Sequence, residues 1–561
     1  MEGQQASGAM RSRPRVFTIP PSVPFLRELA IRLRDGDLVP GFQWNAADPL
    51  AFADATILVP TRRAARSLRE IFLEELGGRA AILPKIRPLG DVDEDGLTLE
   101  AAGDDPDPSL GPAIAPLERR LAMTRLVLGW KRTLAESLKN PVTGLAPTLP
   151  STPAEAAHLA TALLTLMDQV ETEGADWSAL KTLVPEDYAD FWQITLAFLS
   201  IVTEHWPAYL AERGLEDPAR RRNAVMRREA ERLRRLAPTA PVIAAGSTGS
   251  IPAAAELIEV VSRLPNGVVV LPGLDLDLDD AAWDAIGSAG ENVHDNIFGH
   301  PQYGLKLMLE RLRVPREAVE ALGTETPAGK ARGKLLSEAL RPAPTTDTWP
   351  AFAAAIADGS FPMDAALDGF SLIEAASDGE EALAVALALR EAIEDPNASA
   401  ALISPDRALA RRVSAELARW GIAVDDSAGT PLGLTPPVRL ARLVAEVALG
   451  GFEPLSVAAL LSHPQALFGL APKEARRAAR ALELAVLRGP GPPPARRGCA
   501  RPSRRPGNAR RSAAIAPRGR VAVSAPGAGS APAIFWIGSA PRSPRSNAWR
   551  STRSTWLSST S

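Results

Sequence analysis

Two short polar segments combine residue types and a placement that suit phosphate binding. In the first, Thr61, Arg62 and Arg63 directly follow the apolar run at 55–59, and Thr61 is placed to cap a helix that begins there. A helix N-terminus supplies backbone N–H donors and a positive dipole, and the two arginines add charge. We expect this segment to contact a nucleic-acid backbone; the alternative is a capped helix with solvated arginines.

The second segment offers hydroxyl groups in a flexible loop. Ser247 and Thr248 lie between two glycines, directly after the apolar run at 241–245. Open α/β sheets bind ligands outside the carboxyl ends of their strands, which is where this loop would lie. We expect it to contribute to the same DNA-binding surface; the alternative is an ordinary glycine and serine turn.

A third candidate is an arginine-rich helical segment at 218–236. It contains eight arginines, Arg221 and Arg228 among them, against two glutamates. Guanidinium groups crowded within a few turns suit a phosphate backbone, which releases counterions when it is neutralised. The alternative is a solvated helix face.

Most catalytic and metal chemistry is excluded by the residues present. The single cysteine, Cys499, rules out a disulfide, a redox pair or a cysteine-bound cluster within residues 1–488. The five histidines form no HExxH pair, and no GxSxG occurs. His294 and His300 could approach the acids at 275–280 as a metal site, but acids that follow a strand usually only cap a helix or face water, and we favour that interpretation.

The nearest approach to a phosphate-binding loop is the segment from Gly329 to Leu335. A P-loop has four residues between its glycines and a Ser or Thr after its lysine, to ligate magnesium. This segment has three residues between its glycines, and Leu335 follows Lys334. We therefore expect no nucleotide, metal or other cofactor on this chain.

Hydrophobic patterning predicts the elements that position these residues. Continuous apolar runs at 16–19, 55–59, 241–245 and 268–271 predict strands buried on both faces, and amphipathic helical patterns follow the first three. Such alternation indicates an α/β fold with a parallel sheet covered on both faces. From about 115 to 237 the strands disappear and helical patterns follow one another at 117–138, 153–173, 188–213 and 218–236.

A second α/β unit is predicted after a link rich in proline, threonine and alanine. It has expected strands at 370–373, 401–403 and 422–424, with helices between them. The expected organisation is a flexible N-terminus at 1–15, a first α/β domain at 16–114 and 238–340, a helical insertion at 115–237, a linker at 341–369, a partial second α/β domain at 370–435, the start of a helical subdomain at 436–488 and a disordered tail at 489–561.

Charge divides the chain at about residue 489. The formal net charge is −3, but residues 489–561 contain 13 Arg and no Asp, Glu or Lys, so residues 1–488 carry −16. The N-terminus lacks the stretch of about 7 to 15 apolar residues found in a signal peptide, and no run of about 18 uncharged apolar residues occurs. We expect a cytoplasmic protein without membrane contact.

Several segments, in this order, resemble the AddB family, in particular its alphaproteobacterial form. They include FTIPPSVPFLRELA from Phe17, LVPTRRAARSLREIFLEEL from Leu58, LPKIRPLGD from Leu83 and AAGSTGSIPAAAELI from Ala244. HPQYGLKLMLERL from His300, EAASDGEEALAVALALRE from Glu374 and ALISPDRALARRVSAELARWGIAVDDSAGTPL from Ala401 extend the resemblance, so it covers nearly all of residues 15–488.

The resemblance implies a subunit that works with an AddA-like helicase-nuclease on double-strand DNA ends, in a complex that uses ATP and Mg²⁺. It implies two RecA-like domains with helical insertions, as in superfamily 1 helicases, and then a nuclease domain with an iron-sulfur cluster. This chain departs from the pattern: Pro20 and Pro21 stand where a P-loop would follow the first strand, and proline lacks the N–H that cradles phosphate. The expected protein binds DNA and a partner but has no ATPase or nuclease activity by itself; an α/β scaffold without nucleic-acid binding is the alternative.

The composition of residues 489–561 predicts that they are a frameshifted translation. They hold 11 Pro, 12 Ser and a single leucine, Leu557. Shifting the frame with GC-rich codons turns residues 497–510 into ARLRAALAAARERA, which restores helical periodicity. The family's nuclease domain would then be lost, and the fragment would be poorly soluble and nuclease-inactive. Resequencing the gene around codons 485–496 should reveal the shifted frame, whereas a continuous frame to Ser561 would contradict it.

Overall fold

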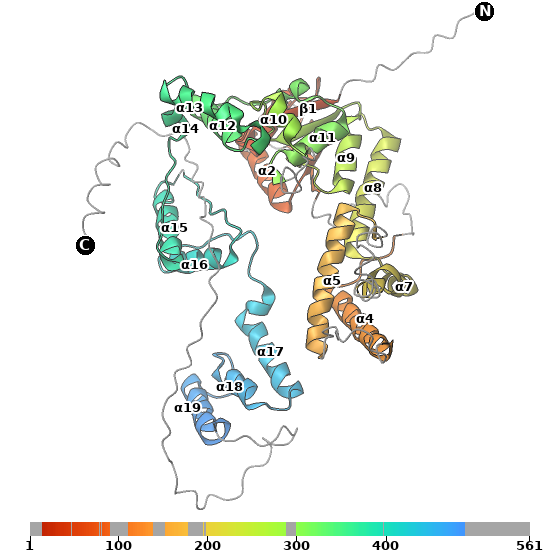
Figure 1. Ribbon diagram of the computed structural model, residues 1–561, viewed down its shortest axis with the longest axis vertical. Coiled ribbons are helices and arrows are strands. Elements are labelled where there is room, and N and C mark those ends of the chain that lie inside the picture. Colours follow the sequence, from red (N-terminus) through yellow and green to blue (C-terminus); the bar gives the residue numbers. More distant parts are fainter. Residues whose placement is uncertain are drawn as a thin grey trace, which may run out of the picture. The chain divides into compact units, whose positions relative to one another are not determined.

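The computed structural model divides the chain into two compact units, residues 1–368 and 369–561. It describes residues 14–45, 48–77, 79, 81–89, 110–137, 152–177, 195, 198–287, 299–396 and 398–488. The residues outside the described ranges include His294, the start of the helical pattern expected at 188–213 (residues 188–194 and 196–197) and the whole tail at 489–561. Figure 1 shows the helices and strands of both units.

Unit 1 is built on a six-stranded, all-parallel sheet, which confirms the α/β class. The strand order is β3-β2-β4-β5-β1-β6. The strands are β1 (Arg15–Ile19), β2 (Thr56–Val59), β3 (Lys85–Pro88), β4 (Val242–Ala245), β5 (Gly267–Pro272) and β6 (Glu320–Ala321).

Helices cover both faces of the sheet, which explains why the strands are apolar without alternation. On one face, α1 (Phe25–Asp35) and α2 (Arg62–Glu75) pack against Ile57, Val268 and Val270. On the other face, α8 (Pro218–Leu236), α9 (Pro252–Ser262) and α11 (Tyr303–Leu312) pack against Leu58 and Val269. Full burial of each such side chain contributes about 1.5–3 kcal/mol.

The four strands expected in this unit are confirmed, but two edge strands were not predicted. Lys85 in β3 is exposed, and β6 consists of the two exposed residues Glu320 and Ala321. Because edge strands are short and tolerate charge and proline, they lack the continuous apolar run that marks the inner strands.

The helical insertion has its own core around the fully buried Trp206. It consists of α4 (Pro116–Ser137), α5 (Pro153–Glu173), a π-helical turn (Ile201–His205) and α7 (Trp206–Arg213). The expected boundary at 237 needs correction, because Ala230 and Leu233 of α8 belong to the core of the sheet. Thus α8 connects the insertion to the sheet.

A buried ion pair joins these helices. Arg119 of α4 lies 2.9 Å from Asp217 and 2.7 Å from Asp168 of α5. The second oxygen of Asp217 accepts a hydrogen bond from Ala219 N and so caps α8, and Trp206 Nε1 donates to Asp217 over 3.2 Å. Burial lowers the pKa of Arg119, but the two carboxylates outweigh it and raise that pKa overall.

Residues 341–368 are folded, so the linker expected at 341–369 is wrong for this stretch. A 3₁₀ segment (Ala343–Thr348), α13 (Trp349–Ala357) and α14 (Met363–Ala366) follow α12 (Pro327–Ala339). Phe361 and Ala366 are buried against Ala331 of α12. The apolar residues spaced among the prolines supply this small core.

The regular elements among the described residues of unit 2 are all helices. It contains α15 (Asp378–Ala392), α16 (Arg407–Ala418), a 3₁₀ turn (Leu432–Leu434), α17 (Pro436–Leu449), α18 (Pro454–Ser462), α19 (Pro472–Leu482) and a π-helical turn (Glu483–Leu487). None of the helices in the described ranges of the chain is long and apolar enough to cross a membrane.

The strands expected at 370–373, 401–403 and 422–424 are not formed. Leu402 and Ile422 pack beside the core of α15 and α16, whereas Leu372 and Ile403 are 79% and 74% exposed. A strand needs hydrogen-bonded neighbours, and a strand that is apolar on both faces needs a covering layer on each. Here the apolar segments are covered on one side only. Their β propensity therefore led to three expected strands that the structure does not contain.

Asp217→Ala should strongly destabilise unit 1. The substitution leaves the buried Arg119 without its buried carboxylate partner and removes the cap of α8, which together should cost about 3–5 kcal/mol in the free energy of unfolding. Urea unfolding followed by circular dichroism measures this loss. Asp168→Ala is the matched control: Asp168 is 46% exposed, and its loss should cost at most about 1 kcal/mol. Equal losses in the two variants would contradict the assignment.

Candidate nucleic-acid interface

All loops that leave the carboxyl ends of the parallel strands meet at one edge of the sheet. The chain passes from β1 and β2 to the face covered by α1 and α2, and from β4 to the opposite face covered by α9. The loop directions therefore change between the neighbouring strands β2 and β4, and between β5 and β1. Such switch points are where open α/β sheets usually bind ligands.

The first switch point brings together two of the segments expected to bind DNA. Strands β2 and β4 are paired, so the loop at Thr61 lies beside the loop that holds Ser247. Thr61 Oγ1 accepts a hydrogen bond from Ala64 N at 3.1 Å and caps α2, as predicted. Arg62 and Arg63 are exposed in the first turn of the helix. The structure places positive charge at a helix N-terminus here.

Apolar side chains fill the crevice between these two loops. A Cβ added to Gly246, whose φ is 78°, would lie 3.2 Å from the ring of Phe25 and 3.5 Å from that of Pro60. Ser247 Oγ accepts from Gly249 N at 3.2 Å, and both Ser247 and Thr248 are half-buried. The hydroxyls are therefore less accessible than the arginines of α2.

The second switch point lacks the features of a phosphate cradle. Thr18 is buried in β1 and fixes the adjoining loop, since its hydroxyl donates to Leu271 O and accepts from Leu274 N. A Cβ added to Gly273 would lie 3.1 Å from Pro21 Cγ. The hydroxyl of Ser22 donates to Glu325 Oε2 at 2.5 Å. Proline and a carboxylate thus occupy the place where a nucleotide phosphate would need N–H donors.

The segment from Gly329 to Leu335 is part of a helix rather than a loop. Thr326 caps α12 by accepting from Gly329 N at 3.0 Å, and residues 327–339 are helical. Its backbone N–H groups beyond the first turn are consumed by helical hydrogen bonds, so they cannot curl around a phosphate. The segment whose glycine spacing differs from that of a P-loop is thus helical in the structure.

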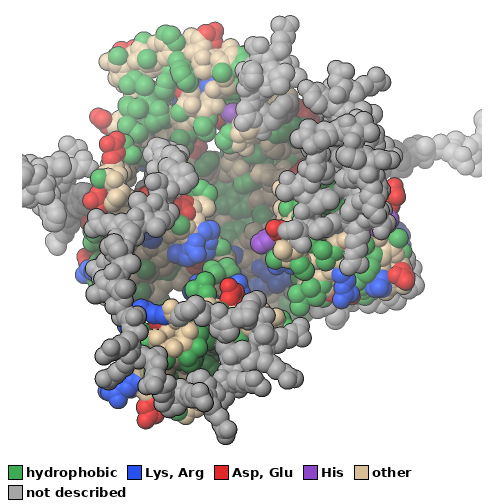
Figure 2. All heavy atoms as spheres, turned by 60° about the horizontal axis from the view of Figure 1, so that its bottom comes forward, with side chains coloured by type: hydrophobic (Ala, Val, Ile, Leu, Met, Phe, Trp, Pro, Cys, Tyr) green, Lys and Arg blue, Asp and Glu red, His purple; other side chains and the backbone are tan. Residues whose placement is uncertain are grey.

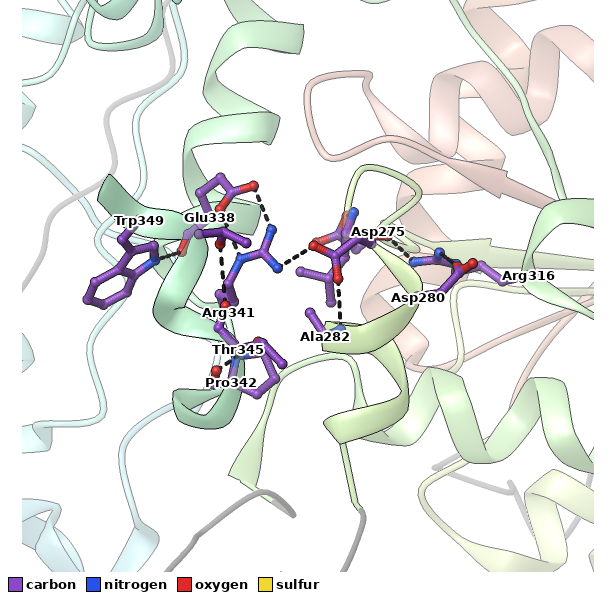
Figure 3. A network of polar contacts seen from close by, with 12 residues as sticks. Asp275, Asp280, Ala282, Arg316, Glu338, Arg341, Pro342, Thr345 and Trp349 are labelled. Carbon is purple, nitrogen blue, oxygen red and sulfur yellow. Dashed lines mark hydrogen bonds and ion pairs between the residues drawn. The ribbon is translucent and has the colours of Figure 1, made fainter. Parts of the chain in front are cut away.

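The acids at 275–280 act as caps and ion-pair partners. Asp279 accepts from Ala282 N and caps α10 (Asp280–Ala285), and the same carboxylate binds Arg341. The backbone hydrogen bond from Ala282 and then Arg341 lower the pKa of Asp279. Figure 3 shows Arg341 between α12 and α10, and Arg316 beside Asp280. Within the described ranges there is no cluster of three or more potential metal ligands.

His300 is likewise bound within the fold. Its Nε2 lies 2.9 Å from the carbonyl oxygen of Leu340, and its Nδ1 accepts from Gln302 N. These contacts support the capping interpretation for the part of the motif that the structure describes; His294 lies outside it.

The arginines of α8 have divided roles. Arg221 is buried and donates to Gly111 O at 3.1 Å, Arg222 donates to Thr172 Oγ1 at 2.9 Å, and Arg232 pairs with Glu229 at 2.7 Å. Arg221 must therefore be removed from the expected DNA-binding residues, because its guanidinium supports the insertion. Arg228 is half-buried and stays a prediction. The sequence does not distinguish a buried arginine from an exposed one, so the two can be told apart only by their contacts in the structure.

A scan against models of known protein families finds no match to this chain, and a search of curated proteins finds no relative.

The closed second switch point predicts that the chain does not hydrolyse ATP. Purified protein mixed with Mg²⁺, ATP and tailed duplex DNA should release phosphate no faster than a mock preparation from cells without the gene. Pro20, Pro21 and the Ser22–Glu325 contact leave no N–H cradle and place a negative charge there. DNA-stimulated turnover that co-elutes with the chain through two chromatographic steps would contradict this expectation.

Proposed function

We propose that this chain is a non-catalytic DNA-binding and partner-binding subunit of an AddAB-type helicase-nuclease that processes double-strand breaks for recombinational repair. In this proposal unit 1 is a RecA-like scaffold, and an AddA-like subunit supplies ATP hydrolysis. The observation that carries it is the exposed N-terminus of α2, where Arg62 and Arg63 lie beside the loop of Ser247 at a switch point of the parallel sheet.

The chemistry of this surface suits a phosphate backbone better than a nucleotide. The first turn of a helix presents backbone N–H groups and a positive dipole, and two arginines extend the positive charge along the surface. Behind them the apolar rings of Phe25 and Pro60 lie close to Gly246, and these rings offer no polar partner to a base or a ribose. Contacts of this kind fix the position of DNA without reading its sequence.

A scaffold without nucleic-acid binding is the second candidate. It is favoured by the internal use of polar groups: Arg221 and Arg222 bind within the helical insertion, and Ser22 binds Glu325. A salt series separates the two candidates, because log affinity falls by about 0.9 per log unit of salt for each phosphate neutralised. The proposed function expects a steep slope on tailed duplex DNA, and weak binding without a slope would favour the scaffold.

Replacing Arg62 and Arg63 together by alanine should weaken DNA binding to a similar degree for different sequences. Loss of two phosphate contacts should flatten the salt slope by about 1.5 to 2. Fluorescence polarisation with labelled tailed duplexes of two unrelated sequences measures both effects.

Arg439→Ala plus Arg442→Ala is the matched control, since both residues are exposed on α17 of unit 2. This variant has the same change in net charge and should keep the slope of the unmodified chain. An unchanged slope for the Arg62 and Arg63 variant, or equal flattening in both variants, would reject the proposed surface.

A further inference from the structure

Unit 2 contains a pocket of about 500 Å³ between α18 and α19. Its lining is mixed: Leu461, Ala466 and Leu467, from the end of α18 and the turn that follows, are apolar, and Ser462 and His463 beside them are polar. Ala466 is buried in a small core with Val457 and Leu460, so this part of the lining is held by packing. Ala475 and Ala479 form the facing wall, and these small side chains, one helical turn apart, leave the space open.

Two arginines and one glutamate, Glu483, supply the charged groups that line the pocket. Arg476 and Arg480 lie one turn apart on α19 and both line the pocket. Arg476 is exposed and makes no ion pair with any described residue. Arg480 lies 3.6 Å from Glu483, whose other oxygen is bound by Arg488 at 2.7 Å. The hydrogen bond from Arg488 is the main cause that lowers the pKa of Glu483, so Glu483 is satisfied without Arg480.

Exposed apolar side chains directly follow two of the lining residues, Leu467 and Glu483, in the sequence. Phe468 is 64% exposed and Leu484 is 55% exposed. Figure 2 shows one face of the molecule, on which hydrophobic side chains lie exposed among those of Lys and Arg. A hollow with apolar side chains inside and two arginines in its lining is complementary to a chain segment that presents aliphatic anchors flanked by carboxylates.

We propose that this pocket docks an acidic amphipathic helix of a partner protein. Aliphatic side chains three or four residues apart would fill the hollow between α18 and α19, as helices do in apolar grooves. Carboxylates on the same face would bind Arg476 and Arg480, because guanidinium and carboxylate form paired, charge-assisted hydrogen bonds. Among the described residues that line the pocket there is no Phe, Tyr or Trp, which disfavours single-stranded DNA, since such sites depend on aromatic stacking.

The inference rests on the part of the proposed function that concerns partner binding, and it locates that binding at the pocket between α18 and α19. It does not depend on the DNA-binding surface of unit 1. The two can therefore fail separately, and one set of variants tests both.

The test uses the full chain and a fluorescein-labelled synthetic helix with leucines at i, i+3, i+4 and i+7 and Asp and Glu beside them. Fluorescence polarisation should show saturable binding, lost when the leucines become serine or the acids become lysine. Arg476→Glu plus Arg480→Glu, and separately Ala479→Trp to fill the hollow, should each weaken binding about tenfold or more. Arg477→Glu, on the same helix but outside the lining, should stay within about twofold. Circular dichroism checks that each variant is folded.

No saturable binding to the unmodified chain, or equal binding by the folded Ala479→Trp variant, would overturn the inference. The inference would also be overturned if a labelled oligothymidylate binds the unmodified chain and the Ala479→Trp variant loses that binding but keeps its binding of the peptide. Titration of the same variants with tailed duplex DNA identifies which proposal fails: intact DNA binding without peptide binding rejects the docking pocket alone. Peptide binding without DNA binding rejects the DNA surface alone.

Discussion

Burial of the parallel sheet on both faces is the constraint on which the rest of unit 1 depends. Ile243 and Val270 in the two central strands are fully buried under helices of one layer, and Val269 is buried under the other. Parallel strands can be covered in this way only if the chain crosses back over the sheet after each strand, so every strand ends at the same edge. That geometry brings Thr61 and Ser247 together although they are far apart in the sequence.

The geometry of this edge is unfavourable for a nucleotide site and more compatible with the proposed contact to a phosphate backbone. Pro21 beside Gly273, and Phe25 with Pro60 beside Gly246, put apolar rings where the two switch points would otherwise open. Arg62, at the N-terminus of α2, nevertheless remains exposed to solvent. In the proposed function, the sheet edge is a docking surface and a partner carries out the chemistry.

Sequence reasoning was reliable where one physical effect dominates. The inner strands and the Thr61 cap were predicted because continuous burial and capping each leave a local pattern. It failed where tertiary context decides. The two-residue strand β6 has no pattern of its own, Arg221 is buried by a contact with Gly111, and the apolar run at 401–403 forms no strand because one face stays uncovered.

Hydrogen–deuterium exchange of the full chain, with and without tailed duplex DNA, tests the central claim most directly. The account predicts that DNA slows exchange of the backbone amides in the first turn of α2, at residues 62–64, and in the loop at 246–250, while the amides after β1 at 22–23 are unchanged. Protection that leaves both of these segments unaffected, under salt conditions where binding is saturated, would contradict it.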